Sequence, residues 1–347
     1  MLGDIATLPM NADECTTMNS TIMTRSRRPT IPSPSAEGRI HVTRNVPAIT
    51  QSGTALTSPA SHAGRVTSGR TGEPVTGLGS PSMHPLFHPG RHPVVGHRGA
   101  AGSAPENTLA ALDAAIGEGA EVLEFDVRLA ADGVPVLMHD PLLDRTTDRS
   151  GPVRERSSEE LAAADAGYRF SPDGGGSFPW RGRGGGIPTL REVLERYPFT
   201  PFLLELKTVE AAEPVRRLLV ELGAEDRTIV ASFFERALLP FREGAIPTAA
   251  SRRRIGLLWL RSLLGLPAPR IPDRVYAVPD RYRDRLHVPT VRFIEAARRA
   301  GYPVHVWTVD DPARAALLWG RGACGMITNY PERLLAERNR LFPAEAG

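Results

Sequence analysis

Residues 94–140 read VVGHRGAAGSAPENTLAALDAAIGEGAEVLEFDVRLAADGVPVLMHD, and this segment decides the fold class. Short β-branched and apolar runs at Val94–His97, Val122–Val127 and Val134–His139 predict strands. The stretch Thr108–Glu118, between the first two runs, has the amphipathic pattern of a helix. A strand followed by a helix and another strand is typical of a parallel sheet covered by helices.

The rest of the chain repeats this alternation, which predicts an α/β fold, a (β/α)8 TIM barrel over residues 91–343. Nine strand candidates compete for eight barrel positions, so at least one is wrong, and those between residues 245 and 280 are the weakest. The further strand candidates are Phe202–Lys207, Thr228–Ser232, Ile255–Trp259, Val275–Val278, Pro303–Val309 and Gly325–Thr328. The further helix candidates are Leu190–Tyr197, Ala211–Leu222, Phe234–Glu243, Val291–Ala300, Pro312–Trp319 and Pro331–Arg340.

Residues 1–90 differ in composition from the rest of the chain. Up to residue 86 they contain no Phe, Tyr or Trp and are crowded with Ser, Thr, Pro and Gly. Such a segment buries too little apolar surface to offset the entropy lost on ordering, so we predict a disordered, low-complexity extension. A start at Met83 would leave a chain of the usual size for one barrel. An alternative hypothesis is therefore that some or all of residues 1–82 come from a misassigned translation start.

The overall composition excludes several classes of protein. Hydrophobic residues make up 41% of the chain and charged residues 23%, as in soluble globular proteins. No apolar run approaches the roughly 20 residues that cross a bilayer, so we expect no stable membrane insertion. The net charge of +3 comes from scattered arginines among nearly as many acids, and we expect no nucleic-acid partner. Cys15 and Cys324 fit no metal or disulfide spacing. The N-terminus has no signal-peptide pattern, so we expect a cytoplasmic protein.

Two predicted strands carry carboxylates at alternate positions. Glu124 and Asp126 are two residues apart in VLEFDV, so they share one strand face, and FLLELK (202–207) repeats this design with Glu205 and Lys207. In a barrel the apolar face packs on the helices, which directs the polar face inward. Three inward carboxylates repel by roughly 4 kcal/mol per close pair at an effective dielectric near 20. An all-oxygen set of this kind suits a hard divalent cation, Mg²⁺ or Ca²⁺.

A simpler interpretation is that each acid pairs with an arginine at the barrel rim, but the repetition of the design on a second strand favours the metal site. Lys207 adds to this view because it is the only lysine among the 42 basic residues. A codon bias toward arginine explains the other positions and does not explain this exception.

Two histidines end predicted strands. His97 closes VVGH and is followed by Arg98, and His139 closes PVLMH. Both would lie at the carboxyl ends of the strands, where barrel active sites form, and two imidazoles suit a general acid and a general base. Arg98 could bind a phosphate bidentately, or it could form a surface ion pair. The histidines without such a context, which we expect to have no part in catalysis, are His84, His88, His92, His287 and His305.

These motifs stand in the order found in the glycerophosphodiester phosphodiesterase family, which the chain resembles over about residues 92–341. The resemblance rests on GHRGA, PENT, EFDV and DGVPVLMHDPLLDRTT, then on IPTLREVL, FLLELK, VASF, VWTVDD and MITNYP. It implies a (β/α)8 barrel of the phospholipase-C-like phosphodiesterase type. It also implies metal-dependent hydrolysis of glycerophosphodiesters to glycerol 3-phosphate and an alcohol.

The resemblance implies a role for each matched residue. Metal binding falls to Glu124, Asp126 and Glu205, acid–base catalysis to His97 and His139, and phosphate contacts to Arg98 and Lys207. A compact ammonium at Lys207 would fit between a metal-bound carboxylate and a phosphate oxygen, where a broad guanidinium would displace one of them.

Four further matched positions each have an alternative role or a departure from the family pattern. Trp307 would line the pocket for the glycerol or the leaving group, with core packing as the alternative. Glu106 and Asn107 would support the loop after the first strand, unless Asn107 is only a helix N-cap. Family members commonly have Asp where this chain has Asn329, a departure that we expect to leave activity intact.

Two other functions remain open. One is phospholipase-D-like cleavage of lysophospholipids, with Phe178 and Trp180 of the Gly-rich loop 171–189, or WLRSLLGL (259–266), contacting the lipid transiently. The other is a non-catalytic barrel that binds phosphodiesters, which the presence of every matched polar residue argues against. The sequence does not assign the acid and the base between the two histidines.

Overall fold

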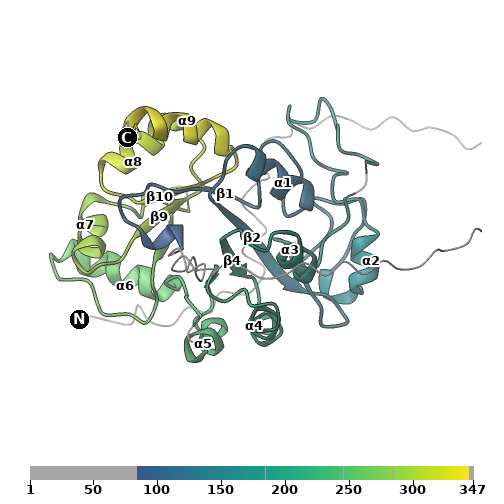
Figure 1. Ribbon diagram of the computed structural model, residues 1–347, viewed down its shortest axis with the longest axis horizontal. Coiled ribbons are helices and arrows are strands. Elements are labelled where there is room, and N and C mark those ends of the chain that lie inside the picture. Colours follow the sequence, from purple (N-terminus) through teal and green to yellow (C-terminus); the bar gives the residue numbers. More distant parts are fainter. Residues whose placement is uncertain (1–83, 184, 245, 284, 344–347) are drawn as a thin grey trace, which may run out of the picture. The chain divides into compact units, whose positions relative to one another are not determined.

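The computed structural model describes residues 84–183, 185–244, 246–283 and 285–343. The predictions for residues 1–83, which include most of the expected extension and the alternative start at Met83, lie outside the described residues. The described part of the chain alternates strands and helices (Figure 1). Among its helices, none has both the length and the hydrophobicity that crossing a membrane requires.

A ring of parallel strands forms the centre of this unit. Its strands are hydrogen-bonded in the order β5, β4, β2, β1, β10, β9, β6, and each neighbouring pair is parallel. Residues 248 and 249 close the ring, because Thr248 bridges Val230 of β5 and Ala249 bridges Val275 beside β6. The described residues thus fill eight positions and confirm the predicted (β/α)8 barrel. The strands are β1 Val94–Gly96, β2 Val122–Leu129, β4 Phe202–Leu206, β5 Thr228–Ser232, β6 Tyr276–Pro279, β9 Val304–Trp307 and β10 Gly325–Thr328.

Two strand candidates are wrong as barrel strands. Residues 255–259 lie in helix α6 (Arg252–Leu263), and residues 248–249 take the barrel position instead. Residues 134–139 do contain a strand, β3 (Pro135–Leu137), but it runs antiparallel to the end of β2, outside the ring. The short loop between β2 and β3 cannot hold the crossover that a parallel pair needs, so a hairpin forms. A second hairpin outside the ring joins β7 (Arg281–Tyr282) and β8 (Leu286–His287).

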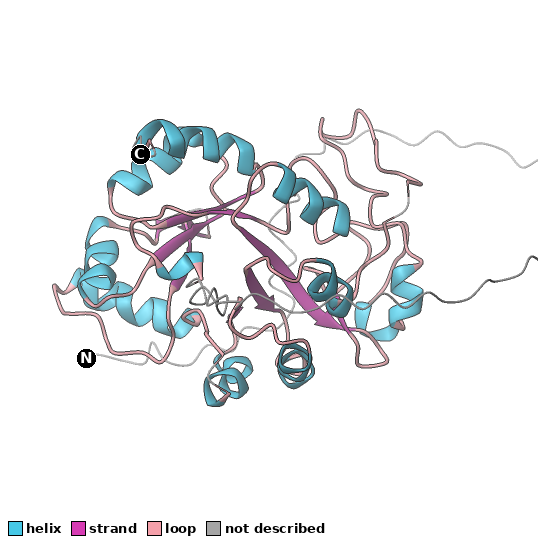
Figure 2. Cartoon of the chain, viewed as in Figure 1, coloured by secondary structure: helices cyan, strands magenta, loops and turns pink. Residues whose placement is uncertain are grey.

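The helices lie outside the strands (Figure 2). The predicted helices are confirmed to within one residue at each end, whereas the sequence patterns do not predict α2 and α6. Side-chain caps explain several starts, since Thr108, Thr189 and Thr290 each accept a hydrogen bond from the backbone amide three residues on. The other helices are α1 Leu109–Gly117, α2 Ser158–Ala162, α3 Leu190–Arg196, α4 Ala212–Glu221, α5 Glu235–Glu243, α7 Val291–Arg299, α8 Pro312–Gly320 and α9 Pro331–Leu341, with 3-10 turns η2 Pro85–Phe87 and η3 Val153–Glu155.

Apolar side chains pack on both faces of the barrel strands, except toward their carboxyl ends. Outward side chains of β2, such as Leu123 and Phe125, are buried against helices. The interior near the amino ends is filled by Leu86, Val95, Val122, Leu203, Ile229, Ala249, Val275 and Ile327. The inward polar side chains of β2 and β4 come next along the strands, at the end where TIM-barrel active sites form.

The segment before β1 closes the amino end of the barrel. Leu86 in η2 is fully buried in the interior apolar layer. Its backbone carbonyl lies 2.9 Å from Nε2 of the buried His305, and Nε2 of His84 lies 3.2 Å from the carbonyl oxygen of Phe202. Residues 84–90, which the composition assigns to the extension, therefore belong to the barrel unit, because Leu86 completes its interior.

Candidate active site

Three carboxylates meet inside the barrel, at the carboxyl ends of two strands. Glu124 and Asp126 come from β2 and Glu205 from β4, and Asp126 and Glu205 are register partners. One oxygen of each carboxylate lies within 4.8 Å of an oxygen of each of the others. Glu124 and Asp126 are buried, with 5% and 1% exposure, and Glu205 is partly buried. Strand register thus brings together the three carboxylates that the sequence singles out.

The charges in this cluster are unevenly compensated. Burial and the neighbouring Asp126 raise the pKa of Glu124 well above its usual range. Burial acts in the same direction on Asp126, but Lys207 and Arg98 outweigh it and hold the pKa of Asp126 well below its usual range. A divalent cation would relieve the repulsion on Glu124, and the all-oxygen donor set fits Mg²⁺ or Ca²⁺.

Lys207 follows β4 and is buried among the carboxylates. Its Nζ lies 2.9 Å from Asp126 Oδ1 and 2.7 Å from Glu205 Oε1, and 9% of its side chain is exposed. Burial alone would lower the pKa of Lys207, but the two carboxylates outweigh burial and raise it. The ammonium is therefore charged at any working pH, and its predicted phosphate contact stays a prediction.

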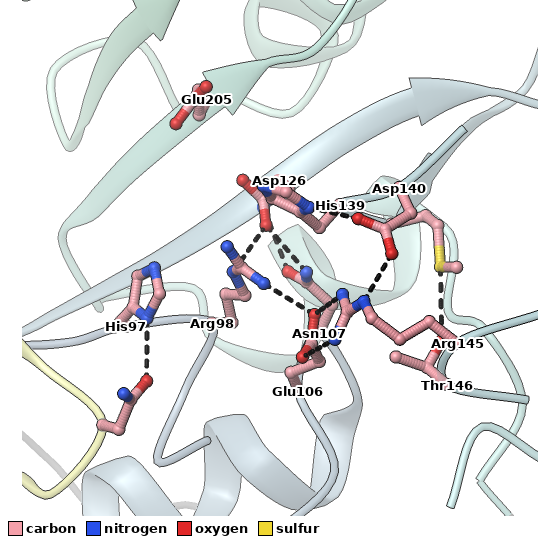
Figure 3. A network of polar contacts seen from close by, with 12 residues as sticks. His97, Arg98, Glu106, Asn107, Asp126, His139, Asp140, Arg145, Thr146 and Glu205 are labelled. Carbon is pink, nitrogen blue, oxygen red and sulfur yellow. Dashed lines mark hydrogen bonds and ion pairs between the residues drawn. The ribbon is translucent and has the colours of Figure 1, made fainter. Parts of the chain in front are cut away.

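The guanidinium of Arg98 forms part of the same charged cluster. Its Nε lies 3.1 Å from Asp126 Oδ2, and its Nη1 lies 2.7 Å from Glu106 Oε1 (Figure 3). Two of its nitrogens are therefore engaged by carboxylates within the chain. The predicted phosphate contact of Arg98 stays a prediction.

The backbone at Arg98 is also part of the site. Its φ of 52° is followed by a φ of 84° at Gly99, where a Cβ atom would lie 2.4 Å from the backbone of Ala111. This turn directs the backbone amide of Arg98 to Glu124 Oε2, at 2.7 Å. Only glycine has the conformation and the small size that position 99 requires.

Asn107 positions one of the carboxylates. Its Nδ2 donates to Asp126 Oδ2 at 2.9 Å, and its Oδ1 accepts from the backbone amide of Asp126 at 3.0 Å. The alternative interpretation of Asn107 as a helix N-cap is wrong, because Thr108 caps α1. The buried amide of Asn107 instead fixes Asp126 in one orientation.

His97 is bound to a neutral side chain. Its Nδ1 lies 2.8 Å from Oδ1 of Asn329, and Nδ2 of Asn329 donates to Asp310 Oδ2 at 2.8 Å (Figure 3 shows the first contact). Burial and the charge of Arg98 lower the pKa of His97 to about 4, against smaller opposing effects of Asn329 and nearby acids. The His97 ring is therefore neutral near pH 7.

His139 is bound to a charged side chain. Its Nδ1 lies 2.6 Å from Oδ1 of Asp140 (Figure 3). His139 reaches the site because β3 runs back along β2, so that it follows a hairpin strand and not a barrel strand as the sequence suggests. A carboxylate partner stabilises positive charge on an imidazole ring more than an amide does.

Arg145 connects the two loops that carry these histidines. It pairs with Asp140 through Nε, and its Nη1 and Nη2 lie 2.7 Å from the two carboxylate oxygens of Glu106 (Figure 3). Burial would raise the pKa of Glu106, but hydrogen bonds from Arg145 and the charges of Arg145 and Arg98 lower it to about 2. The loop after β1 and the loop after β3 are thus held together by charge.

The aromatic side of the site is made by Trp307 and Phe233. Their ring centroids are 6.1 Å apart in an edge-to-face arrangement, and Nζ of Lys207 lies 5.9 Å from the centroid of Phe233. Trp307 also packs against the interior apolar layer, as the core alternative expects, and its pocket role stays a prediction. Phe233 is 44% exposed.

Sequence reasoning missed four residues of the site, Asp140, Arg145, Phe233 and Asp310. Asp140 and Arg145 lie in the quoted motif DPLLDRTT, and Phe233 lies in VASF, so their positions beside assigned residues were a usable signal. Asp310 lies in the quoted motif VWTVDD, after the assigned Trp307, but the motif does not show that its partner is Asn329, 19 residues further along the chain.

Comparisons with known proteins agree on one family. Residues 97–242 and 271–333 match the model of the glycerophosphoryl diester phosphodiesterase family. The protein YhdW of Bacillus subtilis is 35% identical over 253 residues, which cover 70% of this chain and 97% of YhdW. A glycerophosphodiester phosphodiesterase of Caldanaerobacter subterraneus is 30% identical over 249 residues, 70% of this chain and 96% of that protein. The structure of an Oleispira antarctica phosphodiesterase in complex with its product sn-glycerol-3-phosphate superposes with a TM-score of 0.57 at 27% identity, over 71% of this chain and 96% of that one.

Proposed function

Because the chain belongs to the glycerophosphodiester phosphodiesterase family, we propose that it hydrolyses glycerophosphodiesters to sn-glycerol 3-phosphate and an alcohol, with Mg²⁺ or Ca²⁺ held by Glu124, Asp126 and Glu205. The buried carboxylate cluster beside two differently partnered imidazoles carries this proposal. A cation bound to the three carboxylates would neutralise the non-bridging oxygens of the phosphodiester as charge develops in the transition state.

His97 serves as the general base in this proposal. The carboxylate of Asp310 can only accept hydrogen bonds, so the amide of Asn329 turns its NH₂ toward Asp310 and its oxygen toward His97. The proton of the neutral ring then sits on Nδ1, which leaves the lone pair of Nε2 free to take a proton from the nucleophile. The low pKa of His97 keeps this lone pair available at neutral pH.

His139 serves as the general acid. Asp140 accepts from Nδ1 of His139 and supports the positive charge of a doubly protonated ring. Nε2–H of that ring can then protonate the leaving alkoxide. Lys207 donates to a non-bridging phosphate oxygen throughout.

The attacking oxygen in this scheme is the glycerol 2-hydroxyl, as the family's relation to phospholipase C suggests. Its proton passes to His97 Nε2 while an O–P bond forms, and the P–O bond to the alcohol breaks as that oxygen takes the proton of His139. Water then opens the cyclic phosphate with the two proton transfers reversed, which returns both rings to their starting states.

Release of glycerol 3-phosphate from glycerophosphocholine tests the proposal. We expect release that depends on Mg²⁺ or Ca²⁺ and falls to background with EDTA or in Glu124→Gln. Calorimetry should show that Glu124→Gln loses metal affinity while Glu221→Gln, an exposed acid on α4, keeps it. A protein that binds metal and glycerophosphocholine without turnover would instead be the non-catalytic barrel.

Lysophospholipid hydrolysis is the second candidate function. Phe233 and Phe234 are 44% and 50% exposed at the carboxyl end of β5, next to Trp307 and Lys207, where an acyl chain could lie. The loop aromatics offer less, because Arg181 stacks over Phe178 with its carbon Cζ 4.0 Å from the ring centroid. Parallel assays of glycerophosphocholine and lysophosphatidylcholine under one metal condition decide between the two substrates.

A further inference from the structure

The outward face of α6 carries several exposed leucines. Leu257, Leu260 and Leu264, the last being the C-cap of α6, are spaced along one face and are 46%, 53% and 65% exposed. Leu263 and Leu266 beside them are 42% and 43% exposed. An exposed apolar patch of this kind marks a surface that binds a partner.

The segment around α6 also has a one-sided charge. Residues 244–272 contain five arginines and no Asp or Glu, and one of the five, Arg254, pairs with Glu235 and Asp273 outside the segment. Arg253 lies one turn before Leu257 on the exposed face, and Arg270 is exposed beyond the helix. The neighbouring helix α7 adds exposed arginines at positions 292, 298 and 299. The family model leaves residues 243–270 unmatched, so this surface is a feature of the chain and not of the family pattern.

We propose that α6 docks this protein on an anionic lipid surface. Leucines inserted among acyl chains and arginines paired with lipid phosphates are the two contributions that hold an amphipathic helix in a membrane interface. A second copy of the chain fits less well, because a symmetric contact would place like-charged arginines opposite each other. The helix is short, so the contact is reversible and lies in the plane of the membrane.

Vesicle flotation of the whole protein tests this docking. Binding to vesicles of phosphatidylcholine with 30% phosphatidylglycerol should be at least about tenfold tighter than to phosphatidylcholine alone. The variant L257Q/L260Q/L264Q should lose binding, whereas I116Q/V220Q/L317Q, which changes three exposed apolar residues on other helices, should retain it. Both should hydrolyse soluble glycerophosphocholine like the parent, since none of the six residues contacts the site. Three outcomes would overturn the proposal. The parent protein could fail to bind the vesicles, or both variants could lose vesicle binding equally. The parent could also be a dimer that only the α6 variant dissociates.

A second inference concerns the contacts behind His97, and it rests on the proposed role of His97 as base. Asp310 Oδ1 accepts from the backbone amide of Asn329 at 2.8 Å and from Thr328 Oγ1 at 2.9 Å, while Oδ2 accepts from Asn329 Nδ2. The backbone amide cannot reverse its direction. We infer that Asp310 is a positioning residue that sets the polarity of the chain Asp310–Asn329–His97 and with it the tautomer of His97.

The direction of these hydrogen bonds predicts an unusual pair of variants. In Asp310→Asn the new amide must keep its oxygen toward the backbone amide, so its NH₂ faces Asn329. Asn329 then turns its own NH₂ toward His97, which must move its proton to Nε2 and can no longer act as a base. In D310N/N329D the carboxylate at position 329 accepts from both neighbours, which restores the proton to Nδ1.

Nitrogen-15 spectra of His97 and the kcat of each variant test this inference. D310N should show the Nε2–H tautomer with a loss in kcat of about 10²–10⁴-fold, the range for a base in the wrong tautomer, and little change in KM. The double variant should recover the Nδ1–H tautomer and most of kcat. The spectra do not depend on turnover, so an inactive parent protein would contradict the proposed function and leave the tautomer result valid. The inference would be contradicted if His97 of D310N kept its proton on Nδ1. It would also be contradicted if the double variant folded but did not recover the Nδ1–H tautomer and kcat. If D310N does not fold, the spectrum of the parent protein still decides, because a parent His97 ring with its proton on Nε2 would contradict the inference.

Discussion

His97 and His139 have the same ring and the same proposed task of moving one proton, but the residues behind them differ. Behind His97 stands a neutral amide held by Asp310, and behind His139 stands a carboxylate held by Arg145. A neutral partner orients a ring without stabilising its charge, whereas an anionic partner does both. In the proposed mechanism, the division into base and acid would be set by the residue in contact with each ring.

Removal of each ring is the largest expected effect and tests the division directly. His97→Ala and His139→Ala should each lower kcat on glycerophosphocholine by about 10²–10⁴-fold without loss of the fold. A p-nitrophenol leaving group needs no acid in the first step, so release of p-nitrophenol should be rescued in His139→Ala, with the cyclic phosphate as the product, and should stay lost in His97→Ala. Rescue of His97→Ala alone would reverse the assignment of base and acid. Rescue of both variants would remove it. Near-parent activity in either variant would refute its catalytic role.

Replacement of the lone lysine should have the next largest effect, because in the proposed mechanism Lys207 would hold the phosphate on which both proton transfers act. Lys207→Arg preserves the charge, yet the forked guanidinium cannot occupy the space between Asp126 and Glu205. We expect kcat/KM to fall by roughly a hundredfold, comparable to the loss of one preorganised donor. Arg191→Lys on the surface of α3 is the control, and an unchanged kcat/KM for Lys207→Arg would show that only the charge matters.

Weakening the support of one histidine should have a smaller and selective effect. Arg145→Gln removes the ion pairs to Asp140 and Glu106 while both rings remain. We expect about a tenfold loss of kcat on glycerophosphocholine and a smaller loss on the p-nitrophenyl substrate, because only the acid is disturbed. Equal losses on the two substrates would mean that Arg145 supports the whole site and not His139 in particular.

The smallest expected effect is on folding stability and not on activity. It comes from two imidazole rings that are buried at the amino end of the barrel. Burial, the largest cause, lowers the pKa values of His84 and His305 at the amino end of the barrel to about 4. Between pH 4 and 6.5 the unfolded chain therefore binds more protons than the folded one, so stability falls as the pH drops through this window. Urea unfolding in EDTA should show that His84→Gln reduces this dependence by about 1.4 kcal/mol per pH unit. His305→Gln, which removes the other buried ring, should reduce the slope by a similar amount, and an unchanged slope in both variants would contradict the burial argument.

Much of the fold follows from local pattern, and the exceptions have physical causes. The helices were predictable because their apolar periodicity and their Thr caps lie within a few residues of each other. Residues 255–259 were not, because a short apolar run suits a strand or a buried helix equally well. The antiparallel direction of β3 depends on the loop before it, and the closing position at residues 248–249 is too short to show any period.

The candidate site divides in the same way. Alternation along β2 and β4 is enough to direct Glu124, Asp126, Glu205 and Lys207 to inward faces. The partner of His97 could not be placed, since His97 and Asn329 are 232 residues apart in the chain, whereas the partner of His139 is the next residue, Asp140. Asn329 stands where family members commonly have Asp, and the sequence does not show what this change does. In the structure, Asn329 forms a polar pair with Asp310.

By itself, the sequence determined the barrel, the inward carboxylates and the two imidazoles, because each depends on the spacing of neighbours along one strand or helix. Only the tertiary structure decided which groups stand behind His97, how Asn107 holds Asp126, how Arg145 joins two loops, and which face of α6 is exposed. Spacing along a strand sets the direction of a side chain. The direction of a hydrogen bond is set by the atom that it meets, and that atom comes from another part of the chain.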